Sequence, residues 1–207
     1  TNGSSELMTN LSMSLVNALY NLQLMKIAGE NGVAAYGAVM YVNFIFVATF
    51  LGYAIGCAPV ISYHYGAGNH AELKNLYKKS MSIILVWGVI LFGAAQLLAP
   101  VLSKIFVGYN TGLYAMTLHG FRVYAIAFLI IGINIFGSSF FTALNNGLIS
   151  AVISFLRTLV FQVIMVLTLP LWFGINGIWS AISIAEALTL IMTTTFFVRQ
   201  KDKYHYL

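Results

Sequence analysis

The sequence predicts an all-α, polytopic membrane protein in which six transmembrane helices form one lobe. Of the 207 residues, 60% are apolar and only 7% are charged, and the mean hydropathy is +0.88. A soluble domain carries about 25% charged residues, and so few charges cannot cover this much apolar surface in water. Apolar stretches long enough to cross a bilayer recur along the whole chain. These observations exclude a soluble enzyme, a disordered segment and a disulfide-stabilised scaffold.

Six apolar stretches, each near the roughly 20 residues that a spanning helix needs, define the predicted transmembrane helices: 5–28, 33–63, 80–102, 118–143, 148–170 and 175–198. Turns rich in glycine and asparagine separate most of them, at 28–32, 65–69, 108–112 and 145–147, and a turn from proline to glycine covers 170–174. Because the connections are short, sequential helices should run antiparallel within a single unit, 1–207.

The polar connection before the third stretch contains a predicted interfacial helix at 70–79. This segment is amphipathic, and we expect Leu73, Leu76 and Tyr77 to lie against the membrane.

The basic residues lie in loops between the apolar stretches, so the net charge of +5 indicates membrane topology and no nucleic-acid partner. One side of the bundle has two basic groups and the other has three scattered residues: Lys74, Lys78, Lys79, Arg199, Lys201 and Lys203, against Lys26, Lys104 and Arg122. Since cytoplasmic segments are rich in Lys and Arg, we predict a multi-pass plasma (inner) membrane protein with both termini in the cytoplasm. The sequence starts at Thr1 without an initiator Met, so we expect a fragment or a processed chain.

Polar residues inside the apolar stretches are the most informative positions, because hydrocarbon solvates neither charges nor amides. In the first stretch they fall within an arc of about 80° on a helix; they are Glu6, Asn10, Ser14, Asn17 and Asn21. This stripe favours a helix that lines a hydrated cavity. The alternative is hydrogen bonding to neighbouring helices, and Glu6 near the helix start is also favoured by the helix dipole.

Glu186 is the only acidic residue well inside a predicted span. Burial disfavours the charged form of a carboxylate, so such a group can exchange a proton near neutral pH. Glu186 is therefore the first candidate for a coupling site or for the counter-charge of a cation. The alternative is a static pair with Arg157, which a rise of about 1.5 Å per residue places at a similar depth.

Other polar residues within the spans are more typical of contacts between helices than of ligand contacts; they are Asn43, Asn134, Ser138 and Gln162. Tyr20, Tyr36 and Tyr41 are candidates for stacking on a cationic substrate. The sequence has no metal-binding histidine spacing, nucleophile elbow or phosphate-binding glycine loop. We therefore predict no enzymatic activity, and no cofactor or metal other than a coupling H⁺ or Na⁺.

Four segments resemble the multidrug and toxic compound extrusion (MATE) transporters. Residues 52–68, with the sequence GYAIGCAPVISYHYGAG, resemble the end of a helix and the Tyr-Gly-Ala turn that precedes a basic cytoplasmic connection in that family. Residues 154–157, the Leu169-Pro170 pair and residues 173–181 resemble its last two helices. The likeness covers nearly the whole chain, in order and with matching loop lengths.

The resemblance implies a twelve-helix transporter of two lobes, in which this chain is the second lobe and an N-terminal six-helix lobe is its partner. It further implies export of cationic amphipathic compounds in exchange for H⁺ or Na⁺, by rocking of the lobes. Some branches hold a cation with an acid on the seventh helix and an Asp on the tenth. The matching regions here offer Met13, Ser14 and Asn134, so we expect no Na⁺ site of that kind in this lobe. The coupling acid is then Glu186 or a residue of the other lobe.

Two alternatives remain open at this stage. A flippase for a lipid-linked anionic head group requires several basic residues in the cavity, whereas only Arg157 and Arg122 are available. A non-transporting membrane scaffold requires no polar stripe, and Asn17 or Asn21 should then tolerate leucine.

Overall fold

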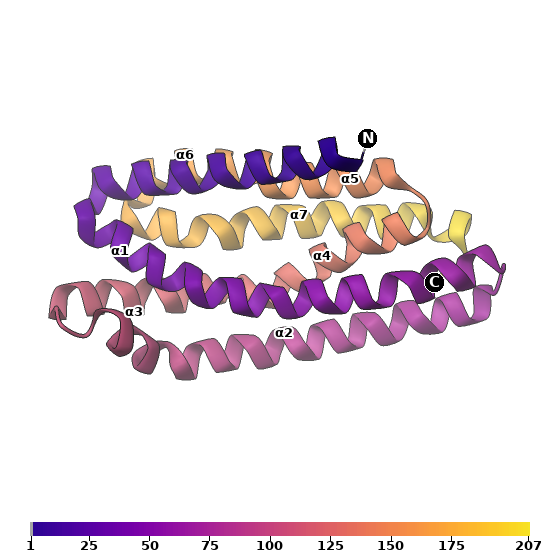
Figure 1. Ribbon diagram of the computed structural model, residues 1–207, viewed down its shortest axis with the longest axis horizontal. Helices are drawn as coiled ribbons and strands as arrows, with labels where there is room; N and C mark the ends of the chain where they lie inside the picture. Colours follow the sequence, from indigo (N-terminus) through magenta and orange to yellow (C-terminus); the bar gives the residue numbers. More distant parts are fainter. Residues whose placement is uncertain (1) are drawn as a thin grey trace.

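The protein is described by a computed structural model, which covers the backbone of residues 2–207 and the side chains of residues 12–207. Helices that run along one long axis make up the described chain, and short turns join them at the two ends of the bundle (Figure 1). Many large apolar side chains point outward, including Leu97, Tyr109 and Trp172, which are at least 80% exposed. Such an apolar exterior matches a lipid environment.

Helix α1 (Asn2–Gly66) consists of two spans that meet at Gly29. Gly29 has φ 64° and ψ −154°, a conformation that side chains with a Cβ rarely adopt. The chain changes direction there and runs back along the bundle (Figure 1). The predicted turn at 28–32 is therefore present, and it depends on a single glycine.

Helix α2 (His70–Val107) corrects the prediction of a separate interfacial helix at 70–79. Asn69 caps the helix by accepting a hydrogen bond from the Glu72 backbone N–H, at 3.1 Å, and the helix then continues into the third span without a break. Leu73 is fully buried and Tyr77 is 8% exposed. These two side chains face the interior because they begin the buried row of α2, which repeats every three or four residues.

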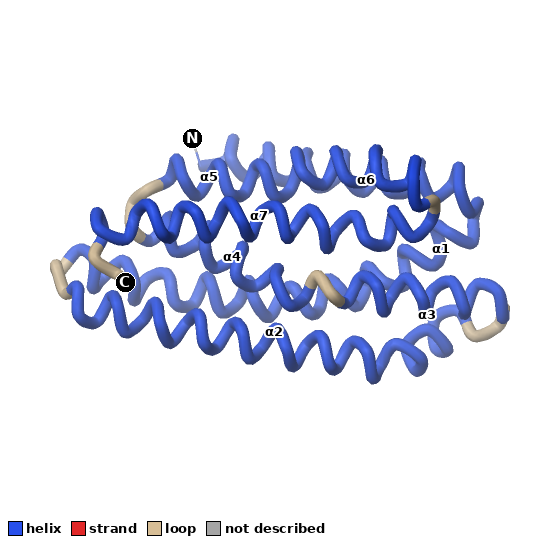
Figure 2. The backbone as a smooth tube through the Cα atoms, turned by 180° about the vertical axis from the view of Figure 1, so that it is seen from behind, coloured by secondary structure: helices blue, strands red, loops and turns tan. Residues whose placement is uncertain are grey.

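The predicted span 118–143 is longer than expected and broken. It consists of α3 (Thr111–Ala125) and α4 (Phe128–Ala143), which are bent by 47° at residues 126 and 127 (Figure 2). Tyr124 and Phe128 are buried on either side of the break, and their rings contact each other with centroids 6.1 Å apart. No proline or glycine stands at the break, so composition gave no signal for it.

The fifth span is one continuous helix made of α5 (Gly147–Phe155), η1 (Leu156–Val160) and α6 (Phe161–Phe173). The sixth span is α7 (Ile175–Tyr204). The segment η1 is a π-helical turn, a feature often found at functional sites. Gly174, with φ 54°, joins α6 to α7. In the described part of the chain, the two halves of α1, the bent α3–α4 pair and the three remaining stretches give six apolar spans.

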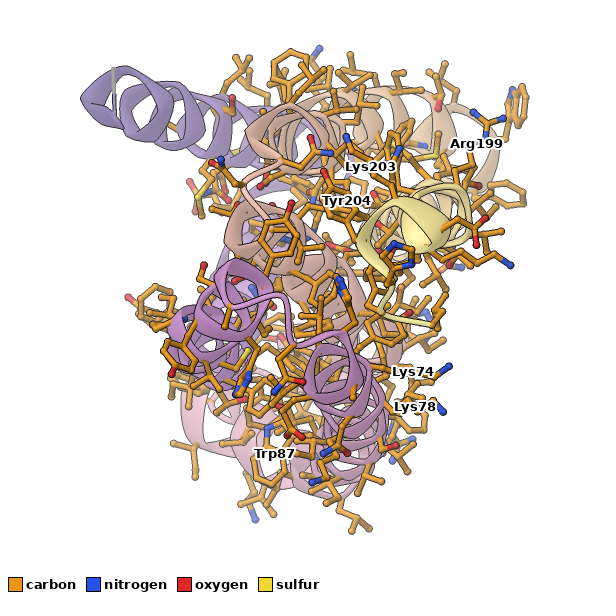
Figure 3. All side chains as sticks on the ribbon, turned by 90° about the vertical axis from the view of Figure 1, so that its right-hand side faces the viewer. Lys74, Lys78, Trp87, Arg199, Lys203 and Tyr204 are labelled. Atoms are coloured by element: carbon orange, nitrogen blue, oxygen red, sulfur yellow. The ribbon has the colours of Figure 1, made fainter. Side chains whose placement is uncertain are left out.

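One end of the bundle is basic. Lys74, Lys78, Arg199 and Lys203 gather there, at the ends of α2 and α7 (Figure 3). The turn between α4 and α5 lies at the same end, because Asn146 Nδ2 donates a 2.9 Å hydrogen bond to the hydroxyl of Tyr204. This arrangement matches the predicted grouping of basic residues on one side.

Candidate functional site

A cavity of about 370 Å³ opens between the two halves of α1 and the helices α3, α4, α5, η1, α6 and α7. Its walls are mostly apolar and aromatic, with a few polar side chains among them. The polar lining residues are Asn17, Tyr20, Tyr36, Asn43, Tyr124, Ser154, Arg157, Thr158, Gln162 and Glu186. An apolar pocket with a few convergent polar groups is typical of a small-molecule site.

An ion pair between Arg157 and Glu186 forms part of the cavity wall. Arg157 Nε donates to Glu186 Oε1 at 2.8 Å and to Oε2 at 3.1 Å. The Glu186 side chain is only 1% exposed, whereas that of Arg157 is 18% exposed. The guanidinium therefore covers the carboxylate on the side of the cavity.

Asn134 holds the carboxylate from behind. Its Nδ2 donates to Glu186 Oε2 at 2.7 Å and to the Glu186 backbone carbonyl at 2.9 Å. Asn134 Oδ1 is buried and has no hydrogen-bond partner among the described residues. The sequence prediction of a contact between helices is correct for Asn134, but the contact is made to the central acid.

Close packing of α4 on α7 brings these groups together. A Cβ added at Gly137 would overlap the Thr193 side chain, so only glycine allows this approach. Asn134 lies about one turn away on the same face of α4. On the other side, the π-helical turn η1 carries Arg157 toward α7.

Two tyrosines form the wall contributed by α1. The Tyr20 and Tyr36 rings are stacked, with centroids 5.0 Å apart and planes at 8°. Tyr36 donates a 3.3 Å hydrogen bond to Asn17 Oδ1. The hydroxyl of Tyr20, which is 2% exposed, and the Oδ1 atom of Asn43 have no hydrogen-bond partner among the described residues. This wall therefore offers aromatic faces and oxygen acceptors, the groups that suit a cation.

The predicted stripe on the first span divides. Ser14, Asn17 and Asn21 are all exposed, and of these three only Asn17 lines the cavity. The side chains of Glu6 and Asn10 lie outside the described residues. The buried row of this helix is Val16, Tyr20 and Leu24, and among Ser14, Asn17 and Asn21 it is Asn17 that lies nearest to that row in helical angle.

The remaining candidates also separate. Gln162 and Asn43 line the cavity. Tyr41 is exposed on the exterior, where its ring stacks on that of Phe106 with centroids 6.1 Å apart. Arg122 is exposed and does not line the cavity.

A row of hydroxyl groups joins α4 to α5, and sequence reasoning singled out only one of its members. Ser138 Oγ lies 2.7 Å from Ser154 Oγ and 2.9 Å from Ser150 Oγ. Thr142 Oγ1 lies 2.7 Å from Ser150 Oγ. The signal was present in two pairs spaced four residues apart, Ser138 with Thr142 and Ser150 with Ser154, but only packing shows that the pairs face each other.

Six apolar spans around an ion-paired cavity define a multi-pass membrane protein. The sequence matches the MatE family over residues 7–168. The chain therefore belongs to the MATE family of transporters. A comparison with curated proteins finds no match.

Solved structures share the fold. One is the outward-facing conformation of a multidrug resistance MATE family transporter of the MOP superfamily, with a TM-score of 0.87, 21% identity, and coverage of 98% of this chain and 45% of that chain. A MATE in the straight conformation gives a TM-score of 0.89 with 20% identity, covering 99% of this chain and 46% of that chain.

A MOP superfamily transporter from Pyrococcus furiosus gives a TM-score of 0.86 with 21% identity, covering 96% of this chain and 45% of that chain. The chain thus spans less than half the length of these transporters, as expected for one lobe.

Proposed function

We propose that this chain is one lobe of a secondary antiporter that exports cationic amphipathic compounds in exchange for H⁺ or Na⁺, in a plasma membrane with its basic end in the cytoplasm. The observation that carries the proposal is the cavity of about 370 Å³ with one buried carboxylate in its wall. The Arg157–Glu186 pair is neutral while both groups are ionised, so protonation of the carboxylate changes the charge of this low-dielectric pocket by one unit, and such a change acts strongly on a charged ligand. Only one guanidinium, that of Arg157, is among the lining residues in the described part of the chain, which favours this function over export of an anionic lipid head group.

The ion pair suggests how exchange is coupled. While Glu186 is ionised, its charge and that of Arg157 cancel, and a cation can rest on the stacked tyrosines and the amide oxygens of Asn17 and Asn43. Protonation of Glu186 leaves the positive charge of Arg157 uncompensated. A bound cation is then repelled, so proton entry drives its release.

Ethidium efflux tests this mechanism in cells that produce the transporter containing this chain. Glu186→Gln leaves the cavity permanently positive, so efflux should be lost at every pH. The double variant Arg157→Gln with Glu186→Gln restores a neutral cavity, and it should bind ethidium but lose the pH dependence of exchange. Glu30→Gln, at an exposed position in α1 that does not line the cavity, is the matched control. Unchanged pH-dependent efflux in Glu186→Gln would remove Glu186 from the mechanism.

A further inference from the structure

The hydroxyl row (Ser154, Ser138, Ser150 and Thr142) runs from the cavity toward the basic end of the bundle. Ser154 lines the cavity, Ser138 and Ser150 are covered by the helices, and Thr142 is exposed. The three successive oxygen-to-oxygen distances are 2.7, 2.9 and 2.7 Å, which match normal hydrogen bonds between hydroxyl groups. An unbroken series of hydroxyl oxygens therefore links the cavity with the surface.

We propose that this row conducts protons between Glu186 and the basic end of the bundle, and that the coupling ion is therefore H⁺. The inference rests on the proposed function. Ser154 and Glu186 both line the cavity, and the polar side chains of Thr158 and Gln162 in the same wall offer hydrogen-bond partners to water.

The transfer needs no group other than those present and water. Each hydroxyl accepts a proton on its oxygen and releases its own hydrogen to the next oxygen, so no atom is gained or lost along the row. A proton that leaves the Glu186 carboxyl reaches Ser154 through cavity water and emerges at Thr142 into the solvent. Rotation of the hydroxyl groups then resets the row. The hydroxyl groups can also donate to backbone carbonyls, but these hydrogen bonds are longer. Ser138 Oγ, for example, lies 3.3 Å from the backbone carbonyl oxygen of Ser150.

The other charged and titratable groups that face Glu186 do not carry its proton to the exterior. Arg157 from η1 keeps its charge and cannot relay a proton. Tyr20, Tyr36 and Tyr124 line the cavity from α1 and α3 but are buried, so they do not reach the exterior. The Tyr36–Asn17 hydrogen bond joins two residues of the cavity lining, whereas the hydroxyl row begins at the cavity and ends at an exposed residue near the basic end.

Proton flux distinguishes conduction from simple bonding between helices. The full transporter that contains this chain is reconstituted into liposomes with a pH-sensitive dye inside, and ethidium drives the exchange. Ser138→Ala interrupts the row and should slow ethidium-driven proton flux at least about ten-fold, while ethidium affinity in detergent stays within two-fold. Ser138→Thr keeps a hydroxyl and should restore the flux. Thr168→Val removes an exposed hydroxyl of α6 that donates to the Ile164 carbonyl, and it should change neither quantity.

Normal flux in Ser138→Ala, or equal loss in Ser138→Ala and Ser138→Thr, would overturn the proton route. Full exchange driven by a Na⁺ gradient alone, unaffected by Ser138→Ala, would overturn it as well. If Ser138→Ala does not accumulate, Ser150→Ala with Ser150→Thr makes the same comparison. The proposed function fails separately, when the wild-type protein does not exchange ethidium or when Glu186→Gln exchanges it normally.

Discussion

Removal of Arg157 should cost far more stability than removal of the charge on Glu186. In Arg157→Gln, the carboxylate of Glu186, which is 1% exposed, loses contacts of 2.8 and 3.1 Å and keeps only the 2.7 Å hydrogen bond from Asn134 Nδ2 and its place beside the cavity. Breaking a buried pair from one side costs about 3–5 kcal/mol. In Glu186→Gln, the remaining guanidinium is 18% exposed and can meet water in the cavity, so the loss should be about 1–2 kcal/mol.

The double variant should lose about as little as Glu186→Gln alone, because no unpaired charge remains buried. The coupling energy between the two positions then equals the loss in Arg157→Gln, about 3–5 kcal/mol. Equilibrium unfolding in mixed detergent at neutral pH measures all three variants, with the exposed Arg199→Gln as the matched control for loss of an arginine. Additive losses in the double variant would show that the carboxylate does not depend on the guanidinium, and the charge argument for the cavity would fail with it.

Two other predictions concern packing and the lining of the cavity. Gly137→Ala places a methyl group against Thr193 and should destabilise the protein by about 1–3 kcal/mol, seen as a lower thermal unfolding temperature; an unchanged temperature would mean that α4 and α7 separate without cost. Asn17→Leu removes a lining amide and should reduce ethidium efflux, whereas Asn21→Leu, at an exposed position outside the cavity, should not. Equal efflux in both variants would show that the Asn17 amide takes no part in the substrate site.

A cluster of aromatic rings holds the basic end of the bundle together. At the basic end, rings of Tyr77, Phe140, Phe197 and Tyr206 contact one another, with Tyr77 and Tyr206 centroids 5.1 Å apart. The hydroxyl of Tyr206 also donates a 2.8 Å hydrogen bond to the Phe197 carbonyl. The residues after α7 are thereby fixed against the ends of α2 and α4, next to the exposed end of the hydroxyl row.

The amino-acid sequence by itself determined the membrane class, the number of spans, the glycine turn at Gly29 and the similar depth of Arg157 and Glu186. Each of these depends on composition, on backbone conformation or on counting residues along a helix. The MATE resemblance likewise followed from motifs that are continuous in the chain, and the family match over residues 7–168 confirmed it.

Only the tertiary structure decided which side of each span faces the cavity. In a membrane, an apolar side chain is about as stable against lipid as against another helix, so hydrophobic periodicity does not mark the buried side of a span. Ser14 and Asn21 are therefore exposed while Val16 and Leu24 are buried. The partner of Asn134, like the facing hydroxyls of α4 and α5, depends on contacts between helices that are distant in the sequence, and no local pattern encodes them.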